Sequence, residues 1–195
     1  MASSHKKVIV RRFLGDVISG YLPLARFVRI RAAGRPEDRV VELLDLSGRI
    51  LSLSLAEIKY ICFVRDFNLT DSVNPERLTR RTFLARPRTE GLWLRLTFRT
   101  PPGTLSSPST ESEQFEGLAP LDLAFADDLV DDAGLFLIPP DIRSNTQRLY
   151  IPRTAFTDLQ LLAVITTPSR RKPEPGSSAL QEDLFHSLPT NSRPN

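Results

Sequence analysis

Cysteine and histidine are scarce in this sequence, and their scarcity removes several classes of chemistry. The 195 residues include one cysteine and two histidines. Cys62 lies in the apolar run YICFV, so no intramolecular disulfide can form and a buried structural thiol is predicted. His5 and His186 fall in segments expected to be unfolded. The folded part therefore lacks the usual general base and the commonest zinc ligand, and we predict that the protein is not an enzyme.

The sequence also predicts no membrane span, no leader sequence and no cofactor motif. No apolar run approaches the ~20 residues of a membrane helix, and the start MASSHKKVIVRR lacks the ~7–15 apolar residues of a signal peptide. Neither G-x-x-x-x-G-K-[ST] nor G-x-G-x-x-G occurs, so no phosphate loop is predicted. The five aspartates between positions 122 and 132 lack EF-hand spacing and are interpreted as a solvated acidic loop. We expect a cytoplasmic protein with no cofactor and no metal site.

What the sequence does contain is a globular composition and a strand-like pattern. Hydrophobic residues make up 41% and charged residues 25%, enough to build a core. Short apolar stretches rich in Val, Ile, Leu and aromatics, separated by glycines, run from Val8 to Val64. The segment RILSLSL alternates apolar and polar residues, as a half-buried strand does. This half is predicted to be an antiparallel β unit.

The second half, Leu92 to Ile165, repeats features of the first in the same order. GYLPL from Gly20 matches GLAPL from Gly117, and VVELLDL matches GLFLIPP. We interpret this as an internal duplication. The predicted fold class is mainly β, with two tandem SH3-like or Sm-like small antiparallel barrels, because closure protects strand edges.

The predicted boundaries follow from these patterns. Asn74 as N-cap, Pro75 and Glu76 favour a short helix through about Leu84, between the two units. A stretch rich in Pro, Ser, Thr and Glu inside the second unit is predicted to be a mobile loop, and the composition beyond Pro168 predicts a disordered tail. The resulting division is a flexible start 1–7, unit one 8–66, a linker 67–91, unit two 92–167 with its loop 100–114, and a tail 168–195.

Two polar clusters are the candidate binding sites. The first is the basic linker, where the predicted helix would place three arginines on one face to dock an acidic partner or a phosphate. Pairing with the acidic loop, which would clamp the units together, is an equally supported alternative. The second cluster follows a predicted strand, where turn-forming polarity is the simpler explanation. The candidate residues are Arg77, Arg80, Arg81, Arg86 and Arg88 in the linker, and Asp141, Arg143, Asn145, Gln147, Arg148 and Arg153 in the second cluster.

Four segments also carry a resemblance to a known family. They are CFVRDF from Cys62, NPERL from Asn74, RPRTEGLWLRL from Arg86 and GLFLIPPDIRSNTQRLYIPR from Gly134. Together they resemble a family of uncharacterised bacterial proteins over about residues 8–166. The resemblance implies a two-copy arrangement, found in some relatives beside signalling or PilZ-like domains, and it implies no established activity.

The functional prediction is an interaction or adaptor module that binds a protein partner. Sm-like RNA binding and PilZ-like cyclic-dinucleotide binding are the alternatives. Arg35 to Arg39 and Arg77 to Arg81 satisfy the R-x-x-x-R half of the PilZ pattern, but the required D/N-x-S-x-x-G does not follow either of them. Phe83 is the one aromatic residue inside the basic stretch, which weakens the RNA alternative.

Overall fold

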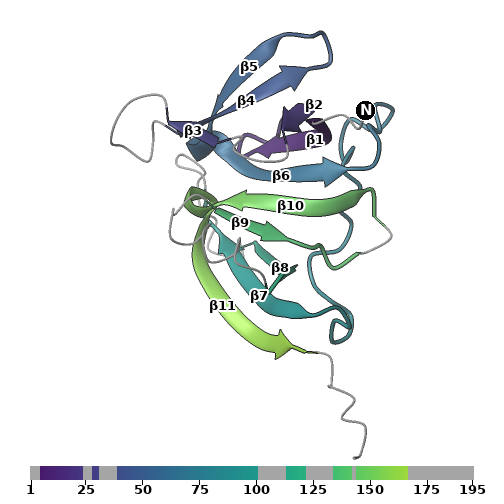
Figure 1. Cartoon of the computed structure of the whole chain (residues 1–195), viewed down its shortest axis with the longest axis vertical. Coiled ribbons are helices and arrows are strands. Elements are labelled where there is room, and N and C mark those ends of the chain that lie inside the picture. The colour runs from purple at the N-terminus through teal and green to yellow at the C-terminus, as the bar shows by residue number, and fades with distance from the viewer. Residues whose placement is uncertain are drawn as a thin grey trace, which may run out of the picture.

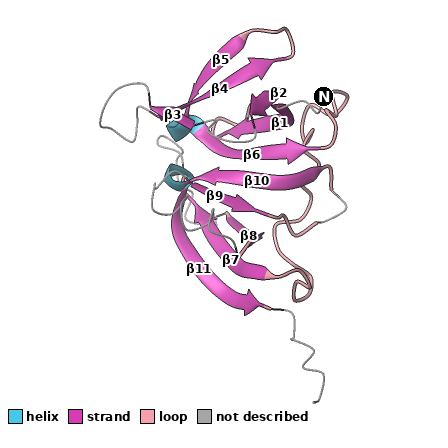
Figure 2. Cartoon of the chain, viewed as in Figure 1, coloured by secondary structure: helices cyan, strands magenta, loops and turns pink. Residues whose placement is uncertain are grey.

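The computed structural model describes residues 5–23, 28–30, 39–100, 113–121, 134–141 and 144–166. Over these residues the protein is mainly β, as predicted (Figures 1 and 2). The first-half strands are β1 (His5–Arg12), β2 (Val17–Pro23), β3 (Val28–Ile30), β4 (Arg39–Asp45), β5 (Ile50–Ser54) and β6 (Ile58–Val64). The second-half strands are β7 (Gly91–Phe98), β8 (Gln114–Ala119), β9 (Gly134–Leu137), β10 (Thr146–Pro152) and β11 (Phe156–Ile165). One 3₁₀ turn precedes the last strand of each half, η2 (Leu55–Glu57) and η3 (Arg153–Ala155).

The strands form two antiparallel sheets. The larger has eight strands in the order β3-β4-β2-β1-β6-β10-β9, with β5 also pairing with β4. The smaller has three strands in the order β11-β7-β8, and a bridge from Leu118 to Ile138 links it to the larger sheet. Two tight hairpins depend on glycine. Gly15 lies in the turn between β1 and β2 with φ of 90°, and Gly48 lies in the turn between β4 and β5 with φ of 84°.

The prediction of two closed barrels is wrong, because neither sheet closes on itself. The reason is visible at β6, whose outer edge pairs with β10 of the second half rather than with a strand of its own half. Leu149 lies opposite Cys62 and Tyr150 opposite Ile61 in this junction. The hydrogen-bonding groups of both edges are satisfied across the halves, so the two halves share one sheet.

The interior is also shared between the halves. One cluster of buried side chains contains Ile9, Tyr60 and Cys62 from the first half together with Leu96 and Phe115 from the second. A second cluster joins first-half residues to Tyr150 of β10. Burial of apolar surface across the junction therefore holds the halves together as one body.

The predicted linker helix is also wrong. The segment from Arg65 to Glu90, called the linker segment below, contains no helix. A single turn forms at Asn74, where the backbone N–H of Arg77 donates to the Asn74 carbonyl at 3.0 Å. Arg77 then adopts a φ of 51°, which no right-handed helix can continue.

The remaining predicted segments lie outside the described residues. These are residues 1–4 of the flexible start, most of the mobile loop, all five aspartates of the acidic loop, and the tail 168–195. The clamp between linker arginines and acidic loop falls there too. The rest of the predicted flexible start, including His5, belongs to β1 instead, because these residues pair with β2. Among the described residues, no helix has the length and apolar character that a membrane span requires.

Cys62 is expected to resist alkylation in the folded protein. Its thiol is buried on the central strand β6, and burial raises its pKa well above the ordinary value, so very little reactive thiolate forms. We expect labelling by iodoacetamide at neutral pH only after denaturation, measured by intact mass. Rapid labelling without denaturant would contradict the buried position of β6.

Candidate functional site

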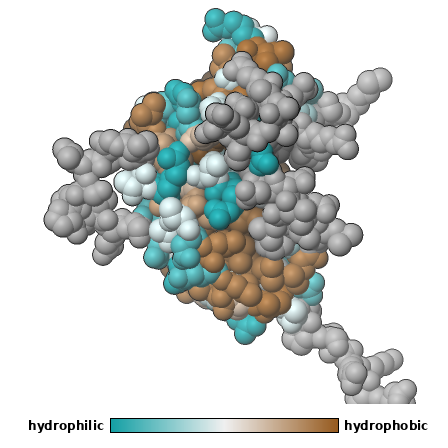
Figure 3. Space-filling model, turned by 90° about the vertical axis from the view of Figure 1, so that its left-hand side faces the viewer, coloured by the Kyte–Doolittle hydropathy of each residue, from teal (hydrophilic) through white to brown (hydrophobic). Residues whose placement is uncertain are grey.

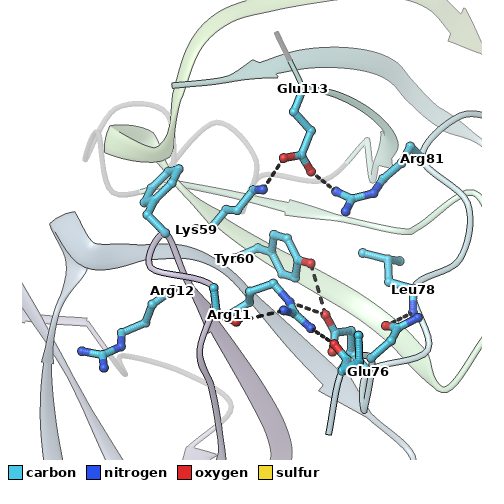
Figure 4. Close-up of a pocket in the computed structure, with 12 residues that line it drawn as sticks. Arg11, Arg12, Lys59, Tyr60, Glu76, Leu78, Arg81 and Glu113 are labelled. Carbon is cyan, nitrogen blue, oxygen red and sulfur yellow. Dashed lines mark hydrogen bonds and ion pairs between the residues drawn. The ribbon is translucent and has the colours of Figure 1, made fainter. Parts of the chain in front are cut away.

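A polar cavity of about 410 Å³ opens between the two halves, where β1, β6, the linker segment and the start of β8 meet. Figure 4 shows the charged side chains that line it. Four of them are basic and two acidic: Arg11, Arg12, Lys59 and Arg81, with Glu76 and Glu113. Phe13, Val73 and Leu78 supply apolar wall, and Tyr60 forms part of the floor. We call this cavity the interdomain pocket.

Glu76 is the most deeply placed charge of the pocket. Its side chain is 2% exposed, and Oε1 accepts hydrogen bonds from Arg11 Nε at 2.6 Å and from the Tyr60 hydroxyl at 3.2 Å. The second oxygen, Oε2, is buried without a hydrogen-bond partner. A buried carboxylate oxygen without a donor costs free energy, so the position of Glu76 depends on the bonds that its other oxygen and its backbone make.

The local sequence holds Glu76 in this position. The Asn74 side chain accepts from the backbone N–H of Leu78 at 3.2 Å and closes the turn that carries Glu76. From β10, the Thr146 hydroxyl donates to the Glu76 carbonyl at 2.9 Å. Asn145 donates to the carbonyls of Asp66 at 2.6 Å and Pro75 at 3.4 Å, which attaches the linker segment to the start of β10.

Arg11 is fully engaged in the architecture of the pocket. Besides Glu76, its guanidinium donates to the carbonyl of Gly15 at 3.3 Å and to that of Val73 at 2.8 Å. Burial is the largest single influence and disfavours its charge, but the hydrogen bond to Glu76 and the attraction of the neighbouring acidic groups together outweigh burial, and the pKa of Arg11 is raised. Burial also raises the pKa of Tyr60, so its hydroxyl stays protonated as a donor.

The opposite side of the pocket carries a shared carboxylate. Lys59 and Arg81 both pair with Glu113, and the Lys59 ammonium lies 5.0 Å from the centre of the Phe98 ring. The Glu113 side chain is 40% exposed. Two cations around one exposed carboxylate leave one positive charge in excess. This side is therefore suited to an incoming anion.

Arg12 is turned toward the rim. Its guanidinium pairs with the exposed carboxylates of Asp16 at 2.5 Å and Glu57 at 3.1 Å. The side-chain hydrogen bond to Asp16 is the main reason that the pKa of Arg12 is raised. Its role is to close the edge of the pocket and not to present a free charge.

Only one of the predicted linker arginines reaches the pocket. Arg81 lines it, while Arg77 donates to Asn68 at 3.1 Å on the outer side. Arg80, Arg86 and Arg88 are exposed along the linker segment. The structure does not bring these arginines together on one face, because the helix that would align them is absent.

The second predicted cluster is dispersed. Asp141 accepts from the Thr79 hydroxyl at 3.2 Å, Arg148 lies over the Phe136 ring at 5.8 Å, and Arg153 lies over the Phe156 ring at 4.9 Å. Asn145 is structural, as described above, and Gln147 is exposed on β10. Arg143 lies outside the described residues. These side chains face different surroundings and form no common site.

Most residues of the interdomain pocket were missed by the sequence analysis. Arg11, Lys59, Tyr60, Glu76 and Glu113 come from four separate segments, and no spacing rule joins them. The motif NPERL contained the strongest signal, since Glu76 follows an N-cap and a proline. It was interpreted as a helix start. No group of three or more His, Cys, Asp or Glu side chains that could hold a metal ion is found within the described part of the chain.

Comparison with family profiles decides the affiliation. A profile matches residues 4–163, which include β1 to β10, β11 as far as Ala163, and the whole interdomain pocket. The chain belongs to DUF6982, a family of unknown function. Comparison with curated proteins and with solved structures gives no match. The resemblance to an uncharacterised family is thereby confirmed, and the DUF6982 match spans both halves, which fits their shared sheet.

Proposed function

We propose that this protein is a non-enzymatic recognition module that binds an acidic segment of a protein partner in the interdomain pocket. The observation that carries the proposal is the pair of cations Lys59 and Arg81, which share the single partly exposed carboxylate of Glu113 in the lining of the cavity. A ligand for this side of the pocket must bring a negative charge. An acidic peptide brings that charge on its Asp and Glu side chains, and its main-chain N–H groups supply hydrogen-bond donors beside them.

The arrangement of charges supports a peptide over a catalytic substrate. Each ionised group of the pocket is held by an ion pair or a buried hydrogen bond, and the Tyr60 hydroxyl is kept protonated. The only thiol, Cys62, is not among the lining residues. Recognition needs preformed complementary charge, whereas nucleophilic catalysis needs an activated group.

The aromatic side chains favour a peptide over a nucleotide. Binding of RNA or a cyclic dinucleotide relies on open aromatic faces for base stacking. In the pocket lining, one face of Phe13 is covered by the Arg99 guanidinium at 4.1 Å, and Tyr60 is 2% exposed. One face of Phe13 is therefore occupied and Tyr60 is buried, so the pocket lining offers little open aromatic surface for stacking, and nucleotide binding is retained only as an outcome of the test.

The proposal is tested by replacing the two cations that face Glu113. We expect a fluorescein-labelled peptide rich in Asp and Glu to bind the full chain, with affinity that falls as salt is added. Because a hydrogen bond to a charged group contributes ~1.5–3 kcal/mol, the double variant Lys59→Gln/Arg81→Gln should bind at least about tenfold more weakly. Fluorescence anisotropy measures both affinities.

A matched control removes the same charge elsewhere. The variant Arg80→Gln/Arg88→Gln loses two exposed arginines of the same linker segment that do not line the pocket, and its affinity should stay within about twofold of wild type. Equal weakening by both variants would show nonspecific attraction. Binding of an RNA oligomer or a cyclic dinucleotide in place of the peptide would replace the proposal with one of its alternatives.

We also infer that the two halves are diverged copies of one unit. The strand pairing of the two halves supports this inference. In the first half β1 lies between β2 and β6, and in the second half β7 lies between β8 and β11. The pairing of β4 with β5 likewise matches that of β9 with β10. The backbone N–H of Phe13 donates to Glu57 just as that of Arg99 donates to Ala155. Both 3₁₀ turns occupy the same place in their half.

Two glycines add a further correspondence between the halves. Gly20 lies opposite Val8, and Gly117 lies opposite Leu94. A Cβ at Gly20 would meet Leu43, while one at Gly117 would meet Leu137, which occupies the matching position on β9. This agreement extends the GYLPL and GLAPL match from sequence to packing.

A further inference from the structure

The junction between the halves leaves two matching strand edges open. Inside the chain, β6 of the first half pairs with β10 of the second. By the correspondence of the halves, β11 is the counterpart of β6, and β5 is the counterpart of β10. Among the described residues, β11 pairs only with β7 and β5 only with β4, so each has one edge without a strand partner.

These open edges lack the features that usually protect an edge strand. Proteins block such edges with lysine, proline or inward charge. The sequence of β5 is ILSLS, without charge, and that of β11 is FTDLQLLAVI, with Asp158 as its one charge and no proline. Both strands are therefore competent to pair with another strand.

Exposed apolar side chains concentrate on the same two elements. On β5 the Ile50 side chain is 72% exposed, and on β11 Leu161 is 57% and Val164 48% exposed. Figure 3 shows an apolar area on the lower part of the molecule, on the side where Figure 1 places β11. Exposed apolar surface beside an unpaired edge is typical of an interaction site.

We propose that the chain self-associates head to tail, with β5 of one copy pairing antiparallel with β11 of the next. The proposal rests on the inferred duplication and uses the β6–β10 junction as its template. In that junction Arg148 lies opposite Phe63 and Leu149 opposite Cys62.

The register of the β6–β10 junction can be transferred to β11 and β5 one strand at a time. Phe63 of β6 lies opposite Val8 of β1, and Leu161 of β11 lies opposite Leu94 of β7, so Leu161 is the counterpart of Phe63. Leu43 of β4 lies opposite Leu51 of β5, and its counterpart Leu137 of β9 lies opposite Leu149 of β10. Leu51 therefore corresponds to Leu149, and the residue before it, Ile50, corresponds to Arg148. Transferred to two copies, the template sets Ile50 of one copy opposite Leu161 of the next, so the two most exposed apolar side chains of these strands meet.

The geometry favours an extending assembly over a closed pair. The β4–β5 hairpin and β11 lie at opposite ends of the molecule (Figure 1), so one copy can use both edges at once. A head-to-tail contact of this type generates rings or open chains. The proposed contact between copies is weaker than the β6–β10 junction inside the chain. At that junction Phe136 and Tyr150 pack together, whereas Glu42 and Ser52 occupy the corresponding positions on β4 and β5.

A complementation experiment tests both the edges and the polarity. Lysine on an edge strand blocks pairing, so Ile50→Lys should disable β5 and Leu161→Lys should disable β11. We expect the full wild-type chain to increase in mass from micromolar to millimolar concentration in sedimentation velocity. Each variant alone should remain a monomer, while a mixture of the two should form a one-to-one complex and nothing larger, since each supplies the edge that the other lacks.

The controls separate this result from loss of folding and from other contacts. Leu84→Lys places the same charge on an exposed linker leucine and should associate like wild type, and circular dichroism should show that all three variants are folded. A wild-type chain that stays monomeric at every concentration overturns the proposal. So does association of Ile50→Lys alone, which would indicate a two-fold contact between β11 strands. Neither result bears on peptide binding, because no peptide is present.

Discussion

Replacing Glu76 with alanine should lower the free energy of unfolding by about 3–5 kcal/mol, the usual cost of removing one partner from a buried ion pair. The substitution leaves Arg11, whose side chain is 17% exposed, with its Nε unpaired, and it removes the acceptor of the Tyr60 hydroxyl. Native domains are stable by only about 5–15 kcal/mol, so the variant should lose much of its stability. Urea denaturation followed by circular dichroism measures the difference.

Two companion variants show whether burial is the cause. Glu57→Ala removes a carboxylate that also pairs with an arginine of β1, but Glu57 is 54% exposed, so the loss should be ~0–1 kcal/mol. Glu76→Gln keeps an acceptor for Arg11 and Tyr60 and should fall between the two. A Glu76→Ala variant as stable as Glu57→Ala would mean that the pair does not hold the linker segment against β1.

The strands were predictable from the sequence because their signal is local. Alternation in RILSLSL and the apolar run YICFV located β5 and β6, and the predicted burial of Cys62 agrees with the structure. The linker helix, in contrast, was predicted from local signals and is absent from the structure, although those signals do have a structural effect. The Asn74 side chain does cap a turn, but the isolated turn has little stability of its own. Tertiary bonds of Glu76 fix it, and Arg77 leaves the helical region.

The open sheets and the pocket depend on contacts between distant parts of the chain. Closure of each half was expected on the ground that edges must be satisfied, yet β6 and β10 satisfy each other. In the pocket, Arg11 pairs with Glu76, and Lys59 pairs with Glu113. Charge patterning grouped arginines that are neighbours in sequence, whereas the site selects one arginine from that group and combines it with residues from β1, β6 and the start of β8.

Strand pairing also distinguishes between registers for the last strand of each half. A constant offset between the apolar residues of β6 and β11 would align Ile58 with Leu159. In the structure Ile58 lies opposite Arg12 and Phe156 lies opposite Phe98, at the bulged start of the equivalent pairs. Under the proposed duplication, Ile58 therefore corresponds to Phe156. Alternating apolar residues fit several registers equally well, and only the backbone pairing distinguishes them.

Gly20→Ala and Gly117→Ala should each destabilise the protein by about 2–3 kcal/mol, because neither site has room for a methyl group. A Cβ at Gly20 would lie 2.5 Å from the Leu44 carbonyl oxygen, and one at Gly117 would lie 2.8 Å from the Leu137 Cβ and Cδ1. The first contact is with backbone, so β2 and β4 must separate locally. The second is with a side chain that can shift in part, so Gly117→Ala should be the milder change. Both are measured by urea denaturation.

Gly15→Ala is the matched control, since it adds the same methyl group where no atom lies within 4 Å. Its φ of 90° still disfavours alanine, which limits the expected loss to ~1–2 kcal/mol. The expected order of destabilisation is therefore Gly20, then Gly117, then Gly15. If Gly20→Ala lowered the free energy of unfolding no more than Gly15→Ala does, β2 and β4 would not approach each other as closely as described. The correspondence between Gly20 and Gly117, and with it the duplication that aligns β5 with β10 and β6 with β11, would then lose its packing argument.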